Sequence, residues 1–300
     1  MSALIIKLGA TGDVVRTSSL LRRLPGPVTW ITAPGNLSLL PTDGFELRCL
    51  SWDDRHQALD RDYDLVISLE DEIDVANFAK ETQHSRLFGA YTDDSRTVRY
   101  TEDASGWFDL SLVSVHGRER ADELKLKNRR SYQDLIFEGL GYRFDGEPYC
   151  LPAATPTGLS GDVAMAPVSG AVWPMKNWAF YPELKDELEQ RGLSVNILPT
   201  RPTLLEHLGD IQGHRCLVSG DSLPMHLALG SNVPCVTIFN CTSPWEIFDY
   251  GLLRKIISPR LGDFFYQRDL DPAATTVVSV NEVLDAVLGQ LERSSSGEGT

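Results

Sequence analysis

The segment Ser219-Gly220-Asp221-Ser222-Leu223-Pro224-Met225-His226-Leu227-Ala228 is the most informative stretch of this chain. It follows the apolar run Cys216-Leu217-Val218, which predicts a buried strand, and it leads into a helix-like stretch from His226 to Gly230. An Asp or Ser at a helix start is a common N-cap, and Pro224 suits the first helical turn. The backbone N–H groups there also suit an anion such as a phosphate. A plain cap needs no imidazole, so Asp221 and His226 together favour a binding site, in which both side chains can grip a sugar hydroxyl.

Strands and helices are predicted in alternation on both sides of that segment. Repeated β-α units predict parallel sheets joined by right-handed crossovers. A capping box at residues 279–282 predicts the start of a C-terminal helix. The other predicted strands cover residues 4–8, 28–32, 65–69, 86–91, 162–168, 193–198, 235–239 and 255–258, and the predicted helices or helical turns cover residues 14–24, 71–80, 131–140, 182–191, 203–208 and 244–250.

Residues 146–158 are rich in Pro, Gly and Thr and show no periodicity, which predicts a linker. We therefore expect an α/β protein with two Rossmann-like domains, residues 1–153 and 159–293, whose sheets face each other across a cleft. The Ser/Gly-rich residues 294–300 predict a disordered tail. Ligands of open α/β sheets bind outside the carboxyl ends of the strands, so the loops that follow strands are the places to look for function.

Composition excludes several functional classes. The net charge of −14 would repel nucleic acid at long range. The sequence contains no run of about 18 apolar residues, so it predicts no membrane-spanning helix. The N-terminus lacks the features of a signal peptide. The five cysteines are scattered without a CxxC pair, which predicts neither a zinc site nor a disulfide framework and favours a cytoplasmic location.

Residues 118–130 are a local exception to this acidity, because they carry a net positive charge. The segment predicts a solvated helix face or, alternatively, a contact for an anionic group on a substrate. Arg118 and Arg120 are the candidate contacts.

The loop after the first predicted strand spans Lys7 to Thr17 and contains two glycines, which permit a tight turn or the close approach of a ligand. Asp13 is expected at the start of the following helix. There it is either an N-cap or first-turn acid favoured by the helix dipole, or a catalytic base, and the spacing alone favours neither.

Two further loops follow strands of the predicted second domain. One contains the small residues Ser169 and Gly170, and then Lys176 just before a helix. A lysine in that place suits a phosphate contact, although it could equally be one more surface lysine. The other loop runs from Phe239 to Pro244.

These loops, in this order, resemble glycosyltransferase family 9, the ADP-heptose heptosyltransferases of the GT-B fold. The family's first pattern is matched by Gly12-Asp13-Val14-Val15-Arg16-Thr17, and its second by Lys176-Asn177-Trp178. Its strongest signature is matched by residues 221–228, followed by residues 240–244. Leu223 stands where the family has Gly, and Asn240-Cys241 stands where it has Gly-Pro. The resemblance covers nearly the whole chain.

The resemblance implies an inverting, metal-independent transfer of a heptose-type sugar from a nucleotide diphosphate donor, ADP-heptose, to an acceptor hydroxyl. It implies no cofactor, and it assigns Asp13 as the general base. The donor-binding residues would be Ser169, Gly170, Lys176, Asp221, Ser222, Leu223 and His226, and on the acceptor side we expect Gly12, Arg16, Arg118 and Arg120.

Two alternatives stay open: a GT-B transferase that uses a hexose nucleotide, and a sugar- or nucleotide-binding protein without turnover. The acidity suits an anionic lipid surface poorly, so we expect no integral membrane contact. The expected acceptor is a saccharide, a small molecule or a protein.

Overall fold

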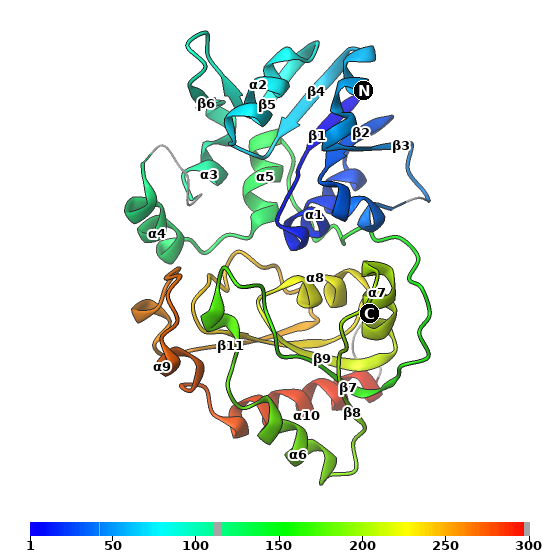
Figure 1. Cartoon of the computed structure of the whole chain (residues 1–300), viewed down its shortest axis with the longest axis vertical. Helices are drawn as coiled ribbons and strands as arrows, with labels where there is room; N and C mark the ends of the chain where they lie inside the picture. The colour runs from blue at the N-terminus through cyan, green and yellow to red at the C-terminus, as the bar shows by residue number, and fades with distance from the viewer. Residues whose placement is uncertain (42, 111–115, 297–300) are drawn as a thin grey trace. The chain divides into compact units, whose positions relative to one another are not determined.

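The computed structural model describes residues 1–41, 43–110 and 116–296, and it divides into two compact units, Met1–Pro152 and Ala153–Thr300 (Figure 1). Each unit has its own sheet and its own hydrophobic core. The two-fold repetition of an α/β unit confirms the fold class that the sequence predicts. The cleft between the units stays a prediction.

The N-terminal unit contains a six-stranded sheet in the order β3-β2-β1-β4-β5-β6. All neighbours pair in parallel except β6, which is antiparallel to β5. This is the strand order of Rossmann folds. The strands are β1 (Ala3–Ile6), β2 (Val28–Thr32), β3 (Leu47–Ser51), β4 (Tyr63–Ser68), β5 (His84–Thr92) and β6 (Val98–Tyr100).

Helices cover both faces of this sheet. α2 packs against one face through Val75 and Phe78, whereas Val14 of α1 and Ile136 of α5 join the core on the other. The fully buried Trp30 belongs to that second core. The helices are α1 (Thr11–Thr17), α2 (Ile73–Glu81), α3 (Ser105–Phe108), α4 (Arg118–Lys127) and α5 (Tyr132–Leu140).

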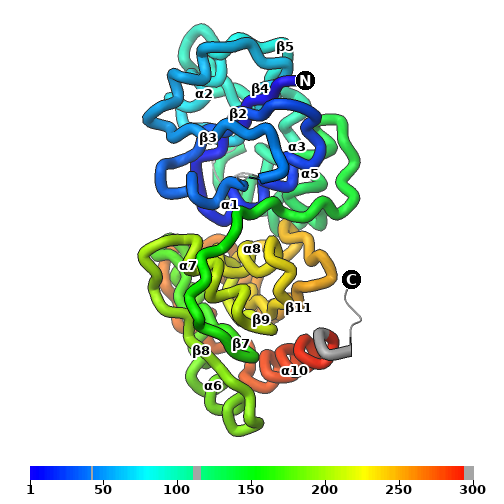
Figure 2. Tube along the Cα trace, turned by 90° about the vertical axis from the view of Figure 1, so that its right-hand side faces the viewer, coloured from blue at the N-terminus to red at the C-terminus, as the bar shows by residue number. Residues whose placement is uncertain are grey.

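The C-terminal unit contains a five-stranded, fully parallel sheet in the order β11-β10-β9-β7-β8. α6 and α10 pack on one face, where Figure 2 shows α10 in red, and α7 and α8 pack on the other. The elements are β7 (Gly161–Ala166), α6 (Tyr181–Glu189), β8 (Val195–Ile197), α7 (Leu204–Gln212), β9 (His214–Gly220), α8 (Leu223–Gly230), β10 (Cys235–Phe239), β11 (Leu253–Ile257), α9 (Pro272–Thr275) and α10 (Val280–Ser296).

Each sheet has a point at which the strand order reverses. In the N-terminal unit it lies between β1 and β4, and in the C-terminal unit between β7 and β9. Ligands of such sheets bind beside these switch points, in the crevice that opens outside the carboxyl ends of the strands. The loops that follow β1, β4, β7 and β9 are therefore the places where a site is expected.

Several predicted elements differ from the observed ones. The helix predicted over residues 14–24 is α1 followed by a 3₁₀ segment, η1 (Ser18–Arg22). The hydroxyls of Ser18 and Ser19 donate hydrogen bonds to the carbonyls of Val15 and Arg16, and such bonds compete with a regular α-helix.

The helical turn predicted over residues 244–250 is wrong. The segment forms turns, and Tyr250 and Gly251 adopt φ angles of 52° and 72°, which no α-helix continues. At the C-terminus, α10 continues to Ser296, so the predicted tail begins inside a helix, and its residues 297–300 lie outside the described part of the chain.

The predicted linker is attached to the unit that follows it. Thr155 N donates to Leu205 O at 3.0 Å, and the Thr157 hydroxyl donates to the carboxylate of the buried Asp210 at 2.5 Å. On the other side, Cys150 N donates to the Ser18 hydroxyl at 2.8 Å. All five cysteines are free thiols; Cys49 is exposed, and the other four are buried.

Candidate functional site

A pocket of about 450 Å³ lies at the carboxyl ends of β7, β8 and β9 in the C-terminal unit. Four residues that the sequence predicts for donor binding line it: Ser169, Gly170, Ser222 and Leu223. The wall opposite them comes from residues 197–207, which the sequence analysis did not select. The pocket therefore occupies the switch point of this sheet, as open α/β sheets require of a ligand site.

The N-terminus of α8 opens into this pocket. Ser222 stands at the N-cap position but makes no side-chain cap, and its hydroxyl donates to Gly220 O at 3.3 Å instead. Plain capping, the alternative that the sequence disfavours, is therefore not observed: neither side chain caps the helix, and the Asp221 carboxylate binds Lys176 and Thr242. Within the described residues, no acceptor is found for the backbone N–H groups of Ser222 and Leu223. Two donors at the positive end of a helix dipole are thus available to an anion.

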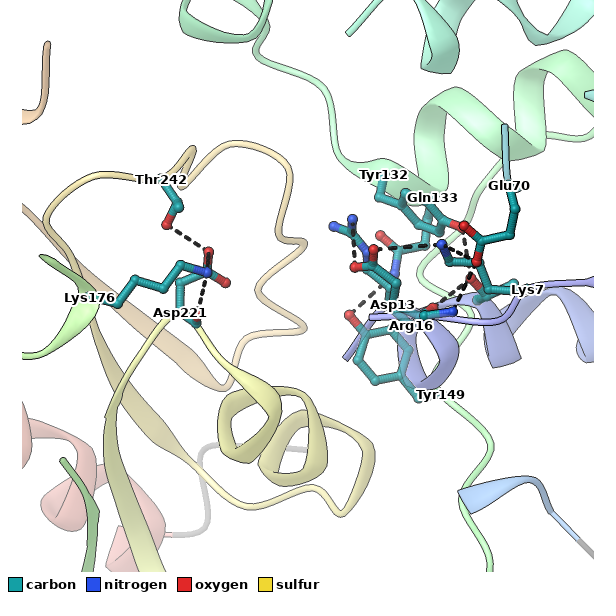
Figure 3. A network of polar contacts seen from close by, with 12 residues as sticks. Lys7, Asp13, Arg16, Glu70, Tyr132, Gln133, Tyr149, Lys176, Asp221 and Thr242 are labelled. Carbon is teal, nitrogen blue, oxygen red and sulfur yellow. Dashed lines mark hydrogen bonds and ion pairs between the residues drawn. The ribbon is translucent and has the colours of Figure 1, made fainter. Parts of the chain in front are cut away.

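Lys176 and Asp221 form a partly buried ion pair beside the start of α8 (Figure 3). The Lys176 Nζ lies 3.1 Å from the Asp221 carboxylate and donates to the Asp221 carbonyl at 2.6 Å. The Thr242 hydroxyl donates to the same carboxylate at 2.7 Å. The lysine predicted to meet a phosphate is therefore committed to a carboxylate in this structure.

Burial acts to raise the pKa of Asp221, but the charges of Lys176 and His226 and the donated hydrogen bonds outweigh it and leave that pKa below its ordinary value. His226 lies on α8 and is buried. Gly220 makes this packing possible, because a Cβ there would lie 2.6 Å from the backbone oxygen of Lys176. The pair is thus held by close contact between the loop after β7 and the end of β9.

In the N-terminal unit, Asp13 lies in the first turn of α1, whose N-cap is Ala10. The Asp13 carboxylate forms an ion pair with Arg16 at 3.0 Å, and the Lys7 Nζ lies 3.8 Å from the same carboxylate. Asp13 is thus an acid of the first helical turn and not the N-cap, and its catalytic role stays a prediction. Gly12, which is predicted for the acceptor side, belongs to the same helix.

Lys7 also pairs with Glu70, which follows β4 on the other side of the switch point. Its Nζ donates to Glu70 Oε1 at 2.9 Å (Figure 3). Burial acts to lower the pKa of Lys7, but the carboxylates of Glu70 and Asp13 outweigh it and raise that pKa. Lys7 is therefore a firmly charged, buried cation next to Asp13.

Aromatic rings enclose the other cation of this cluster. The Arg16 guanidinium lies 4.1 Å from the ring centroid of Tyr132 and 5.5 Å from that of Trp107. The buried Lys125 of α4 lies 5.4 Å from the same Trp107 ring. Stacking of this kind suits guanidinium groups and fixes the orientation of Arg16.

Arg118 and Arg120 are placed differently from Lys125. Both are exposed on α4, where they pair with Asp122 at 3.8 Å and with Glu123 at 2.7 Å. The helix face predicted from the charge pattern exists, but the residue that reaches the Arg16 cluster is Lys125.

Sequence reasoning missed Lys7, Glu70, Thr242 and Arg201. Glu70 had a usable signal, since it follows a buried apolar strand directly. Arg201 lines the pocket and pairs with the fully buried Asp210 at 2.6 Å. Nothing local in the sequence marks that pair, because its partners belong to a loop and to a helix.

No cluster of three or more His, Cys, Asp or Glu side chains is arranged to hold a metal ion in the part of the chain that the structure describes. Among the helices of that part, none has the length and apolar character needed to cross a membrane.

The sequence matches no family model and none of the curated proteins. Solved structures match over nearly the full chain. Heptosyltransferase WaaC of E. coli, solved with ADP-2-deoxy-2-fluoro heptose, is 16% identical, with a TM-score of 0.60 over 96% of this chain and 99% of that one.

Two further structures agree. A glycosyl transferase family 9 protein of Veillonella parvula is 14% identical, with a TM-score of 0.66 over 97% of both chains. The ADP-heptose LPS heptosyltransferase II of E. coli is 15% identical, with a TM-score of 0.60 over 98% of this chain and 100% of that one. The chain thus has the GT-B fold of these glycosyltransferases.

Proposed function

We propose that this protein is an inverting, metal-independent glycosyltransferase of the family 9 type, which moves a heptose-type sugar from ADP-heptose to an acceptor hydroxyl. The observation that carries the proposal is the fold likeness over 96% of the chain to a heptosyltransferase solved with an ADP-heptose analogue. The segments that resemble the family support it, because those after β1, β7 and β9 lie at the switch points of the two sheets.

The donor would occupy the pocket of the C-terminal unit. Its diphosphate would accept hydrogen bonds from the open N–H groups of Ser222 and Leu223, and Lys176 would neutralise the charge that grows on the leaving group. Preorganised donors of this kind stabilise a transition state strongly, and each is worth roughly 3 kcal/mol of barrier. This cationic environment would take the role that a divalent metal takes elsewhere. Donor binding then requires Lys176 to share its charge between Asp221 and the phosphate.

Asp13 would accept the proton of the acceptor hydroxyl as that oxygen attacks the anomeric carbon. Attack from the side opposite the leaving diphosphate inverts the configuration. A sugar hydroxyl is too weak an acid to attack without such help. Arg16 and Lys7 hold the Asp13 carboxylate in place, and the aromatic stack around Arg16 keeps that arrangement rigid. The reaction requires the acceptor oxygen beside Asp13 to reach the bound donor.

The test combines a donor panel with one substitution. We expect ADP to bind more tightly than UDP or GDP in calorimetry, and ADP-heptose to be consumed in the presence of an acceptor. Asp13→Asn is expected to lower kcat by about 10²- to 10⁴-fold, because it removes the general base, and to leave ADP affinity unchanged.

Each other result identifies an alternative. Preferred binding and turnover of a hexose nucleotide would replace the donor in this proposal. Tight nucleotide binding without turnover of any donor would leave a binding protein, and an Asp13→Asn variant with wild-type kcat would remove the assigned base.

The acceptor is proposed to be a soluble saccharide, small molecule or protein. The net charge of −14 disfavours an anionic membrane surface, and the exposed arginines of α4 are already paired with acids. Transfer to detergent-free acceptors at both low and high salt is expected, and a strict requirement for anionic lipid vesicles would contradict it.

A further inference from the structure

Glu70 links the two loops that meet at the switch point of the N-terminal sheet. Its carboxylate lies at the end of β4, with a side chain only 12% exposed. A single oxygen, Oε1, accepts hydrogen bonds from Leu8 N at 2.6 Å, from Gly9 N at 2.9 Å and from Lys7 Nζ at 2.9 Å. Leu8 and Gly9 belong to the loop that leads into α1. One acidic side chain therefore holds the backbone that presents Asp13.

Lys7 lies closer to the Glu70 carboxylate than to the Asp13 carboxylate. The ammonium group lies between two carboxylates, 2.9 Å from Glu70 and 3.8 Å from Asp13. The interaction of a unit charge falls with distance, so Lys7 stabilises the Asp13 carboxylate less than it would in direct contact. A base that is stabilised less as an anion takes up a proton more readily.

The other charged and titratable groups of this cluster come from every element packed against it. Arg16 of α1 pairs directly with Asp13, and the Tyr132 hydroxyl of α5 lies 2.7 Å from the Thr17 hydroxyl. Burial is the main cause that raises the pKa of Asp71, and the charge of Lys7 opposes that rise only weakly. Lys125 of α4 reaches the cluster through the Trp107 ring. Lys7 donates a hydrogen bond to Glu70, which is also the carboxylate nearer to its ammonium group.

We propose that Glu70 is a positioning residue, which sets the basicity of Asp13 by holding Lys7 away from it and by clamping the loop at Leu8 and Gly9. The proposal rests on the assignment of Asp13 as the base. Burial raises the pKa of Glu70, and Lys7 and the two N–H groups oppose that rise. Such opposing effects are expected where two carboxylates share one buried cation.

Glu70→Gln separates this role from a merely structural one. The amide oxygen of Gln still accepts the hydrogen bonds of Leu8 and Gly9, so the loop keeps its geometry. The charge that holds Lys7 is lost, and Lys7 is free to move into contact with Asp13. The Asp13 carboxylate then becomes a weaker base.

The expected result is a shift of the acid limb of the kcat–pH profile to lower pH by about one unit, accompanied by a lower plateau. The carboxyl carbon of Asp13, assigned by its loss in Asp13→Asn, should show the same shift when followed by NMR in ¹³C-Asp-labelled protein. A purely structural role would lower kcat or stability without moving either titration.

A double substitution shows whether Glu70 acts through Lys7. In a Lys7→Met background, Glu70→Gln is expected to move the Asp13 titration by less than half of its effect in the native background. An equal shift in both backgrounds, or no shift in either, would overturn the proposal. Asp71→Asn is the matched control, since it removes the same charge one residue along the chain, where the carboxylate bonds Tyr100 at 3.0 Å and neither loop N–H. It should shift the titration less than Glu70→Gln does.

The NMR titration needs no turnover. If the native protein transfers no sugar, the proposed function fails, while the response of Asp13 to Glu70→Gln still tests the coupling between the two carboxylates.

Discussion

At the scale of single residues, each unit contains a lysine that pairs with one or two carboxylates near the end of a parallel strand. Lys7 forms ion pairs with Glu70 and Asp13, and Lys176 forms one with Asp221. Removing such charges from water costs free energy that their attraction repays only in part, so a buried ion pair is weak evidence for stability. Their position at the switch points is the one that the proposed binding and catalysis would require.

The hydrogen bond from Thr242 to Asp221 should be measurable as stability. Thr242→Val keeps the shape of the side chain but leaves a buried carboxylate without one donor, and it should cost about 2 kcal/mol in free energy of unfolding, measured by urea denaturation. Thr32→Val is the matched control, since the Thr32 hydroxyl is buried and has no hydrogen-bond partner among the described residues. That control should be neutral or stabilising, and equal losses at both positions would contradict the account.

Acid should weaken the C-terminal unit through Asp221. Its pKa is below the ordinary value in the folded state, so between the folded and unfolded pKa values the unfolded chain binds more protons. The stability that this carboxylate contributes is therefore complete above about pH 4 and is lost as the pH falls further. The difference in urea midpoint between the native protein and Asp221→Asn should narrow from pH 6 to pH 3. A constant difference would count against the pKa assignment.

The sequence predicts candidate site residues where they belong to a local motif. Asp13, Asp221 and Ser222 come within a few residues of predicted strands, in segments that follow β1 and β9 beside the switch points, and their roles stay predictions. Lys7 and Glu70 escaped prediction because their importance comes from a contact across 63 positions of the chain. The sequence predicts Lys176 as a phosphate contact from its loop, but only the fold shows that it pairs with Asp221.

At the scale of the elements, α7 fits closely against the chain segment that enters the C-terminal unit. A Cβ at Gly209 would lie 2.1 Å from the backbone oxygen of Thr155, which leaves no room for a side chain. Gly209→Ala should therefore destabilise the protein by roughly 1–3 kcal/mol through overpacking, despite the better helix propensity of alanine.

Gly289 in α10 is the matched helical position, since nothing lies within 4 Å of a Cβ built there. Gly289→Ala should raise stability by about 0.5–1 kcal/mol. Thermal unfolding of both variants measures the two stabilities. A gain in stability for Gly209→Ala as well as for Gly289→Ala would show that the packing of α7 is looser than described.

Buried strands were easier to predict than edge strands and helix boundaries. Val28–Thr32 and Cys235–Phe239 match their predictions fully, because every residue in them is buried and apolar runs mark them. The sequence does not predict β3, because most of its residues are partly or fully exposed and form no apolar run. It does not predict β6, because that strand has only three residues. The end of α1 depends on serine side chains that bond the backbone, which apolar periodicity does not report.

At the scale of the whole molecule, the two units are expected to divide the chemistry. All residues that line the pocket proposed for the donor lie between Ala166 and Pro224, inside the C-terminal unit. Residues 153–300 expressed alone should therefore fold and bind ADP, and ADP at 100 times its Kd should add about 2.7 kcal/mol of stability. Calorimetry and thermal shift check this, with residues 1–152 as the control that should not bind. A folded C-terminal unit without ADP affinity would move the nucleotide site elsewhere.

The positions of the five cysteines allow local unfolding to be followed by thiol labelling. Cys49 is exposed on β3, Cys150 is buried in the N-terminal unit, and the remaining three are buried in the C-terminal unit. Burial raises the pKa of Cys216 to about 12, so that thiol scarcely reacts while the fold is intact. A chromogenic thiol reagent should consequently label Cys49 at once and the others only as their surroundings open. Peptide mapping of the labelled sites would then show, cysteine by cysteine, which half of the chain melts first.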